Sequence, residues 1–211
     1  MTGSRLLGSK DNRRPLALFG GRFDPVHRAH TAIAQAVADT LNLNEVHWIV
    51  TGEPKHKPVV ASPEDRLHMV KLALHDLGDH RMEADDREII AAKNGCSNYT
   101  ADTVEAIQRE SPGRKLIWIL GEDQLQRIHS WSRWKWLIHQ VSFAVCTRSD
   151  SHSGNVLVEL EKHGAEIRYI GVDRDTVSST EIRYRIRSGD RVDELLSRSV
   201  SQYISATGLY R

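Results

Sequence analysis

Gly20-Gly21-Arg22-Phe23-Asp24-Pro25-Val26-His27-Arg28-Ala29-His30 is the stretch that decides how this sequence folds. It follows the short apolar run of residues 16–19 and leads into residues 28–41, where apolar side chains recur at helical spacing. The predicted order is strand, glycine turn, helix. Glycines let the backbone approach an anion closely, and a helix start offers unpaired N–H groups and the positive end of its dipole. The stretch therefore predicts a phosphate-binding loop directly after the first strand.

His27 and His30 are three residues apart at the start of this predicted helix, so they share one face. The plain alternative is a tight turn with two surface histidines. The phosphate loop GxxxxGK[ST] of common NTPases and the dinucleotide motif GxGxxG are both absent from the stretch. Zinc would need ligands beyond the two histidines, and no Cys or HExxH pattern supplies them. No metal-binding residue is therefore predicted.

The rest of the chain alternates between β-prone apolar runs and helical segments. Strands are predicted at residues 16–19, 45–50, 115–120, 141–145 and 167–170, with a weaker one at 81–84. Helices are predicted at 28–41, from the Ser62 cap onward, from a Thr100 cap to about 111, at 156–163, and as the only elements from Ser178 on. A basic loop joins the second strand to the second helix at residues 51–61. This rhythm predicts an α/β fold, a Rossmann-like doubly wound parallel sheet with a small helical C-terminal region.

Composition narrows the class of protein. The chain has 211 residues, of which 39% are hydrophobic, and its 29 Lys and Arg against 28 Asp and Glu leave a formal charge of +1. That content suits one folded domain, predicted at residues 16–211 behind a flexible, polar N-terminal extension at 1–15. A balanced charge provides no global field for nucleic acid or an anionic membrane, so neither is a predicted partner.

Cysteine usage and hydropathy predict the compartment. Cys96 and Cys146 are too few for a disulfide framework, and no apolar stretch approaches the length of a membrane span. The start of the chain lacks the apolar core of a signal peptide. We expect a cytoplasmic protein with two structural thiols. Homo-oligomer formation is left open by the sequence.

Several ordered motifs carry a resemblance to a known family. Residues 20–30 resemble the GxFDPxHxGH signature of the HxGH-type nucleotidyltransferases. The later motifs RLHM (66–69), SNYTADT (97–103), GEDQL (121–125), Trp131, SSTEIR (178–183) and GLYR (208–211) are similar to those of the bacterial nicotinate mononucleotide adenylyltransferases. The resemblance covers about residue 16 to the end. It implies transfer of AMP from ATP to nicotinate mononucleotide, which gives deamido-NAD and pyrophosphate.

The resemblance also implies the ATP site. His27 and His30 would be the catalytic residues, donating hydrogen bonds to phosphate rather than acting as nucleophiles. Mg²⁺ would be held mainly by the ATP phosphates. The hydroxyls of 178–180 with Arg183 would cradle the distal phosphates, although a plain helix cap explains these letters equally well. The implied ATP-binding residues are Gly20, Gly21, Arg22, Phe23, His27, His30, Gly121, Asp123, Ser178, Ser179, Thr180 and Arg183.

The implied site for nicotinate mononucleotide consists of Lys57, Tyr99, Thr100, Asp123 and Trp131. Tyr99 and Thr100 would meet the carboxylate, Asp123 the ribose hydroxyls, and the Trp131 ring would stack on the pyridine. For Lys57 a solvated charged loop is an equal alternative, and Asp123 could instead cap a helix. Neighbouring Trp134 and Trp136 are predicted to pack in the core.

The sequence departs from the family pattern at four places. Arg22 replaces the usual Thr or Ser, Ala29 the usual Gly, and Ser132 an aromatic residue that often follows the tryptophan. The loop at residues 51–53 also lacks the asparagine that is common there. Arg22 either adds a phosphate contact or obstructs the loop. Two rivals therefore stay open: a transferase of the same superfamily with another acceptor, and a nucleotide-binding module without catalysis.

Overall fold

The computed structural model describes residues 14–53, 60–96, 98–147, 154–172 and 177–211. Nearly all of the predicted N-terminal extension and the predicted substrate residue Lys57 lie outside these ranges. The predictions made for them are therefore not examined by the structure.

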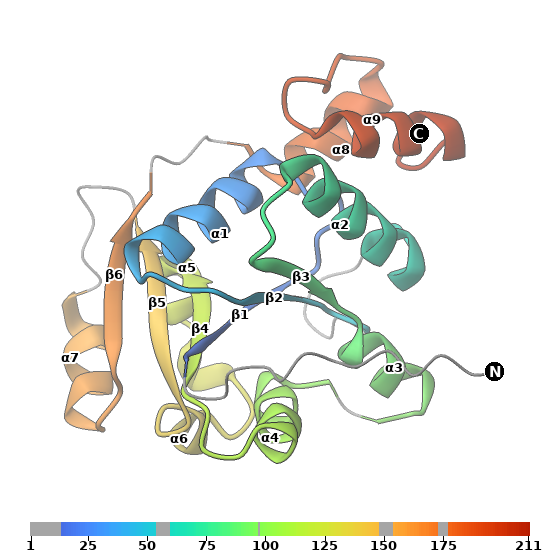
Figure 1. The fold of residues 1–211 in the computed structure, drawn as a ribbon. Coiled ribbons are helices and arrows are strands. Elements are labelled where there is room, and N and C mark those ends of the chain that lie inside the picture. The colour runs from blue at the N-terminus through green and yellow to red at the C-terminus, as the bar shows by residue number, and fades with distance from the viewer. Residues whose placement is uncertain (1–13, 54–59, 97, 148–153, 173–176) are drawn as a thin grey trace.

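A six-stranded, fully parallel sheet forms the centre of the molecule, with strand order β3-β2-β1-β4-β5-β6 (Figure 1). The strands are β1 (Leu16–Gly21), β2 (Val46–Val50), β3 (Met82–Asp85), β4 (Leu116–Gly121), β5 (Val141–Thr147) and β6 (Ile167–Gly171). The chain builds the sheet outward from β1 to β3, then returns to pair β4 with the other side of β1. This is the doubly wound order of Rossmann-like folds, and it confirms the predicted fold class.

Helices cover both faces of the sheet. The first face carries α1 (Arg28–Thr40), α2 (Pro63–Leu77) and α9 (Arg198–Thr207), with α8 (Ser179–Ser188) beside them. The second face carries α4 (Thr100–Glu110), α6 (Trp134–Leu137) and α7 (Gly154–Lys162). Shorter elements are α3 (Arg87–Lys93), α5 (Glu122–Leu125) and the 3₁₀ turn η1 (Ile128–Ser130).

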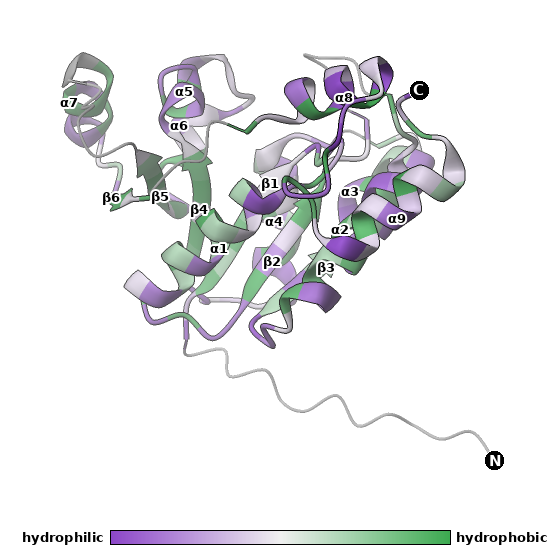
Figure 2. Cartoon of the chain, turned by 90° about the horizontal axis from the view of Figure 1, so that it is seen from above, coloured by the Kyte–Doolittle hydropathy of each residue, from purple (hydrophilic) through white to green (hydrophobic). Residues whose placement is uncertain are grey.

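Alternating strand residues feed two hydrophobic cores, one on each face. Ala17 and Phe19 of β1 enter the core under α1, α2 and α9, whereas Leu16 and Leu18 enter the core under α4, α6 and α7. Central strands buried on both sides are expected to be apolar almost throughout, and Figure 2 shows β4 and β5 mainly green. The helices α1 and α2 alternate between green and purple, as helices with one buried side do.

Most predicted elements are confirmed, with some corrections at their ends. β1 continues through Gly20 and Gly21, which pair with Ile49 and Val50 of β2, so the predicted glycine turn is wrong. The predicted Thr100 cap is also wrong, because Tyr99 is the N-cap of α4 and Thr100 its first helical residue. The short helices α3, α5 and α6 were not predicted, since four to seven residues carry little periodicity. Within the described ranges, no helix is both long and apolar enough to cross a membrane.

Candidate active site

The carboxyl ends of β1 and β4 lie side by side at the point where the strand order reverses. Ligands of open parallel sheets bind at such a point. Two cavities open there, a small cavity of about 230 Å³ and a large cavity of about 590 Å³. Both cavities are lined by Gly20, Gly21, Arg22, Asp123 and Gln124. A group bound in one cavity can therefore meet a group bound in the other.

Gly20 and Gly21 are required by close packing at this shared wall. A Cβ on Gly20 would lie 2.6 Å from the Trp118 ring, and one on Gly21 would lie 2.7 Å from the Phe23 ring. Real Cβ atoms do not approach so closely. Phe23 is 2% exposed and has a positive φ of 49°, so the chain turns sharply directly after β1. Because Gly20 and Gly21 have no side chains, the rings of Trp118 and Phe23 can pack directly against the backbone at the end of β1.

His27 and His30 form a stacked pair at the start of α1. Their ring centroids are 3.7 Å apart, and the backbone N–H of His27 donates to Nδ1 of His30 at 3.2 Å. Because Nδ1 of His30 accepts this bond, the proton of the neutral ring is on Nε2. Burial lowers the pKa of His27 to about 4 and that of His30 well below its usual value, and the adjacent His27 lowers the latter further. Both rings are neutral at pH 7 in the free protein, and His30 lines the small cavity with an N–H donor.

The backbone N–H groups of this helix start are only partly available to an anion. The N–H of Arg28 donates to the carbonyl of Leu195 at 3.1 Å, and that of His30 donates to the carbonyl of His27 at 2.9 Å. The prediction of unpaired first-turn N–H groups is wrong for these two positions. An anion in the small cavity would depend more on side-chain donors.

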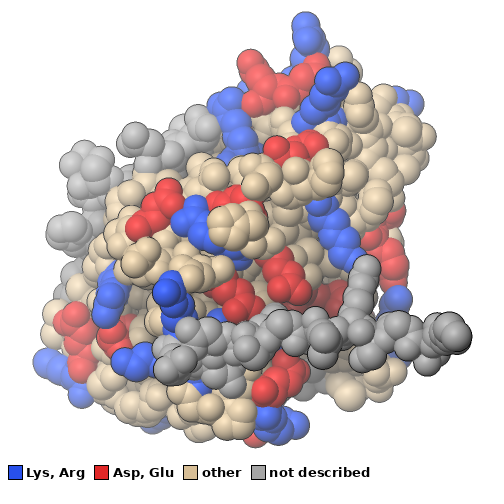
Figure 3. All heavy atoms as spheres, viewed as in Figure 1, with Lys and Arg blue, Asp and Glu red and all other residues tan. Residues whose placement is uncertain are grey.

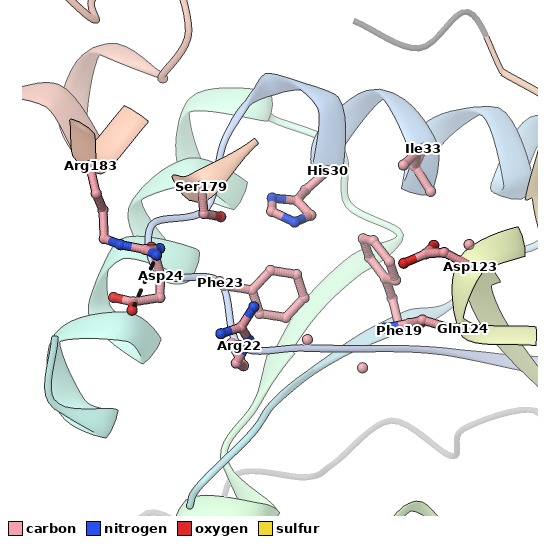
Figure 4. A pocket seen from close by; sticks show the side chains of 13 residues that line it. Phe19, Arg22, Phe23, Asp24, His30, Ile33, Asp123, Gln124, Ser179 and Arg183 are labelled. Atoms are coloured by element: carbon pink, nitrogen blue, oxygen red, sulfur yellow. Dashed lines mark hydrogen bonds and ion pairs between the residues drawn. The ribbon is translucent and has the colours of Figure 1, made fainter. Parts of the chain in front are cut away.

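Two guanidinium groups supply positive charge to the small cavity. Arg22 follows β1 and Arg183 comes from α8, and both line the cavity on the side opposite Asp123 (Figure 4). Burial lowers the pKa of Arg22, and the charge of Arg183 lowers it further. Two like charges near each other favour binding of an anion that neutralises both. The sequence prediction that α8 begins with its Ser178 cap is confirmed, since the Ser178 hydroxyl accepts from the backbone N–H of Glu181 at 3.2 Å.

The α8 segment is attached to the loop after β1 by hydrogen bonds. Arg183 donates to the carbonyl of Asp24 at 2.6 Å, and the Ser179 hydroxyl donates to the carbonyl of Pro25 at 2.9 Å. Figure 4 shows Arg183 reaching down from α8 to Asp24. Segments more than 150 residues apart therefore form one wall of the site.

Asp24 is the main acceptor of this region. Its carboxylate, 2% exposed, accepts from the backbone N–H groups of Val60 and Ala61 at 2.8 and 3.2 Å and from the Tyr210 hydroxyl at 2.7 Å. Burial, and next the bond to Asp24, raise the pKa of the Tyr210 phenol. The carboxylate thus joins the loop after β1, the start of α2 and the end of the chain. Asp24 and Tyr210 stand in motifs of the sequence, but no spacing rule could have paired them.

Arg66 is a second organising residue that the sequence reasoning gave no role. Its fully buried guanidinium donates to the carbonyl of Arg22 at 2.9 Å and to that of Gly52 at 3.0 Å. These carbonyls belong to the segments that follow β1 and β2. Arg66 therefore sets the spacing of the two segments that border the site.

The large cavity is lined by aromatic and polar side chains. Tyr99 and Thr100 line it from the start of α4, and Trp131 lines it after η1. The Trp131 ring meets Trp118 edge-on, with centroids 6.3 Å apart and planes at 83°. Its position suits stacking on a flat ring. Ser132 lines the same cavity, so no second aromatic follows Trp131 there.

Not every predicted site residue contacts a cavity. His27, Ser178 and Thr180 are absent from both linings, and the Thr180 hydroxyl accepts from Arg183 at 3.3 Å. Trp134 and Trp136 pack against the second core, as predicted. Asp123 lines both cavities, and its alternative role as a cap is wrong because Gly121 is the N-cap of α5. The buried carboxyl of Glu88, which the sequence did not single out, lines the large cavity.

The surface seen in Figure 3 shows acidic and basic side chains interspersed. No continuous basic surface crosses this face among the residues described.

Comparison with known proteins identifies the family. The sequence profile of the family described as cytidylyltransferase-like matches residues 18–185. A relative from Neisseria meningitidis serogroup B, named "Probable nicotinate-nucleotide adenylyltransferase", is 34% identical over 204 residues, which cover 93% of this chain and 98% of the relative. The chain belongs to the nicotinate-nucleotide adenylyltransferase family. Another relative so named, from Wigglesworthia glossinidia brevipalpis, is 33% identical and covers 92% of this chain and 96% of its own.

A solved structure has the same fold as this chain. The nicotinic acid mononucleotide adenylyltransferase of Plasmodium falciparum, complexed with NaAD, superposes with a TM-score of 0.79. The match covers 94% of this chain and 98% of that one at 17% sequence identity. At this identity the likeness establishes the common architecture.

Proposed function

We propose that this chain transfers AMP from ATP to nicotinate mononucleotide, forming deamido-NAD and releasing pyrophosphate. The observation that carries the proposal is the meeting of two chemically different cavities at the ends of β1 and β4. One offers hydrogen-bond donors for phosphate, the guanidinium groups of Arg22 and Arg183 and the neutral ring of His30, and the other is aromatic, with Tyr99 and Trp131. The names of the curated relatives support the same reaction.

In this reaction, a phosphate oxygen of nicotinate mononucleotide attacks the α-phosphorus of ATP. A new P–O bond forms, the bond from the α-phosphorus to the oxygen bridging to the β-phosphate breaks, and pyrophosphate leaves with that electron pair. The attacking phosphate is mostly dianionic at neutral pH, because its second pKa is about 6. The chain therefore needs no general base, and its contribution is positioning and charge neutralisation.

The small cavity would hold the phosphates of ATP. His30, through its Nε2–H, would donate to phosphate oxygens as charge develops, and the guanidinium groups of Arg22 and Arg183 would neutralise them. His27 would support His30 through their stacked rings and donate from its own ring. The remaining ATP-binding residues that we propose are Gly20, Gly21, Phe23, Gly121, Asp123 and Ser179, which line the cavity, and Ser178 and Thr180, which flank Ser179 at the start of α8.

The large cavity would hold nicotinate mononucleotide. We assign the pyridine carboxylate to Tyr99 and Thr100, the stacking surface to the Trp131 ring, and the ribose hydroxyls to Asp123 at the shared wall. Its phosphate would then lie near Arg22, which lines both cavities and borders the reacting α-phosphorus. Lys57, outside the described residues, stays a prediction for the same substrate.

Mg²⁺ fits the small cavity as an ion carried by the triphosphate. Of the two carboxylates that line it, Asp24 already accepts three hydrogen bonds and Asp123 is assigned to the ribose hydroxyls, so we assign the ion no protein ligand. When bound, Mg²⁺ supplies charge neutralisation to the phosphate oxygens. The arginines and His30 would complement that charge from the other side.

We also infer a reducing compartment, the cytoplasm, from the two cysteines. Cys146 is buried in β5 and Cys96 is exposed, and both are free thiols. Homo-oligomer formation, which the sequence leaves open, would be tested by size-exclusion chromatography with light scattering.

The test of the proposed function is an assay of pyrophosphate release from Mg-ATP, with the nucleotide product identified by mass. Parallel reactions would contain nicotinate mononucleotide, nicotinamide mononucleotide, phosphopantetheine or no acceptor. We expect release with nicotinate mononucleotide and formation of deamido-NAD, both abolished when EDTA removes the divalent ion. ATP binding without release in any reaction would instead identify a non-catalytic module. Release with only another acceptor would identify a different transferase.

A further inference from the structure

Glu88 is a buried acid at the end of the large cavity. It lies in the first turn of α3, is 6% exposed, and lines the cavity together with Asn98, Tyr99 and Thr100. The Thr103 hydroxyl donates to its Oε1 at 2.8 Å. Burial without a cationic partner disfavours the charged form of a carboxyl group, so the folded protein does not require Glu88 to be ionised.

The partners of Glu88 belong to the segment that forms the end of the cavity. Thr103 lies one turn into α4, three residues after Thr100. Asn98 hydrogen-bonds the Glu88 carboxyl and donates to the carbonyl of Glu53 at 3.2 Å. The Glu88 carboxyl is thus fixed beside the position proposed for the carboxylate of the pyridine ring.

The surroundings of Glu88 bring the protonated and ionised forms of its carboxyl group close in free energy at neutral pH. Burial raises its pKa to about 7, and Asp85 of β3 adds to the rise, whereas Arg87 and the hydrogen bonds from Thr103 and Asn98 oppose it. Glu53 and Arg127 line the same cavity from the segments after β2 and α5. At neutral pH the carboxyl therefore exists both as a neutral acid and as a carboxylate.

The neutral and ionised forms of Glu88 would interact differently with nicotinate mononucleotide and nicotinamide mononucleotide. A neutral carboxylic acid can donate a hydrogen bond to a pyridine carboxylate. An ionised one repels that carboxylate but can accept a hydrogen bond from a carboxamide N–H. We propose that Glu88 determines the preference between acidic and amide pyridine mononucleotides, admitting the acid when protonated and disfavouring it when ionised. This inference rests on the proposed function.

The test measures kcat/KM for nicotinate and nicotinamide mononucleotides at saturating Mg-ATP, from about pH 6.5 to about pH 8.5. Titration of the phosphates affects both acceptors alike, so the ratio of the two constants isolates the pyridine end. For the unmodified chain, we expect the acid-to-amide ratio to fall about tenfold between pH 7 and pH 8.5, chiefly through KM, because the protonated fraction falls by that order. For Glu88→Gln, which stays neutral, we expect a ratio that does not change with pH.

Two further variants complete the design. Thr103→Val removes a hydrogen bond that lowers the pKa of Glu88, so the fall in the ratio should move to higher pH while remaining as steep. Glu53→Gln, which neutralises an exposed acid of the same cavity, should keep the unmodified slope. If Glu88→Gln does not fold, the shift of the pH dependence in Thr103→Val still tests the role of Glu88.

Three outcomes would overturn the role of Glu88: a flat ratio in the unmodified chain, an unchanged slope in folded Glu88→Gln, or a slope abolished by Glu53→Gln. These outcomes differ from failure of the proposed function, in which nicotinate mononucleotide gives no turnover at any pH.

Discussion

His27 and His30 are neutral in the free protein, and His30 lines a cavity that also contains two guanidinium groups. The cause is burial, because a charged imidazole would lose its hydration without gaining an anionic partner. A phosphate in the small cavity would supply that partner and raise the pKa of both rings. At the scale of single residues, the two imidazoles, unlike the guanidinium groups of Arg22 and Arg183, would therefore gain positive charge only when an anion binds.

Replacement of His30 tests its role as a phosphate donor. We expect His30→Ala to lower kcat about 10²–10³-fold, because one preorganised donor to the developing charge is lost. The KM for nicotinate mononucleotide should change little, since His30 does not line the large cavity. Steady-state kinetics would measure both. His75→Ala, which removes an imidazole that is 87% exposed on α2, serves as the control and should keep normal turnover. Near-normal turnover of folded His30→Ala would remove the role assigned to it.

The burial of His27 predicts a pH dependence of stability. Below pH 6.5 the unfolded chain protonates His27, whereas the folded protein resists protonation down to about pH 4. The unfolded state then binds more protons, so the free energy of unfolding falls as the pH falls. Between pH 7 and pH 5, we expect the unmodified chain to lose about 2 kcal/mol more than His27→Gln. Urea denaturation at both pH values would measure this difference, and equal losses would contradict it.

At the scale of elements, the end of β1 shows why the glycines stand where they do. The sequence predicted them as a turn that exposes backbone to an anion, whereas they are ladder residues of β1 covered by aromatic rings. The periodicity of residues 16–21 could not reveal this, because the ring that meets Gly20 comes from Trp118 of β4. Capped helices were predicted more accurately. Ser62 and Ser178 signal the starts of α2 and α8 through local hydrogen bonds that need no distant partner.

A pair of glycine substitutions tests this packing. Gly20→Ala would place a Cβ 2.6 Å from the Trp118 ring, so we expect a loss of about 1–3 kcal/mol in the free energy of unfolding. Gly171→Ala is the matched control, because Gly171 also ends a strand but has open space around its Cβ position. We expect it to change stability by less than about 0.5 kcal/mol. Denaturant unfolding of both variants would measure this, and equal stabilities would refute the packing argument.

At the scale of the whole molecule, the C-terminal helices complete the site. Tyr210 reaches Asp24 across 186 positions of sequence, and Arg183 and Ser179 bond the same loop from α8. The helical C-terminal region is therefore a structural part of the proposed phosphate site. Figure 1 shows it packed beside α2, at the end of the sheet where β1 leads into α1.

Removal of the Tyr210 hydroxyl tests this long-range link. We expect Tyr210→Phe to lower the free energy of unfolding by about 1–3 kcal/mol, since a buried carboxylate loses one of its donors. The KM for ATP should rise as well, because Asp24 positions the loop that carries Arg22. Tyr184→Phe on α8, where the side chain is 61% exposed, is the control for loss of a tyrosine hydroxyl. Thermal unfolding and ATP kinetics that match this control would contradict the link.

What the sequence by itself determined is local: the strands, the main helices and the family, while the phosphate-binding role of residues 20–30 stays a prediction. Apolar periodicity, capping residues and an ordered set of motifs encode these within short stretches of chain. Only the tertiary structure decided that His30 is a neutral donor, that Arg66 holds the ends of two strands, and that Glu88 is a buried acid beside the large cavity. These properties depend on burial and on partners that are distant along the chain. Neither burial nor a distant partner produces a periodic or regularly spaced pattern of residues that could be recognised in the sequence.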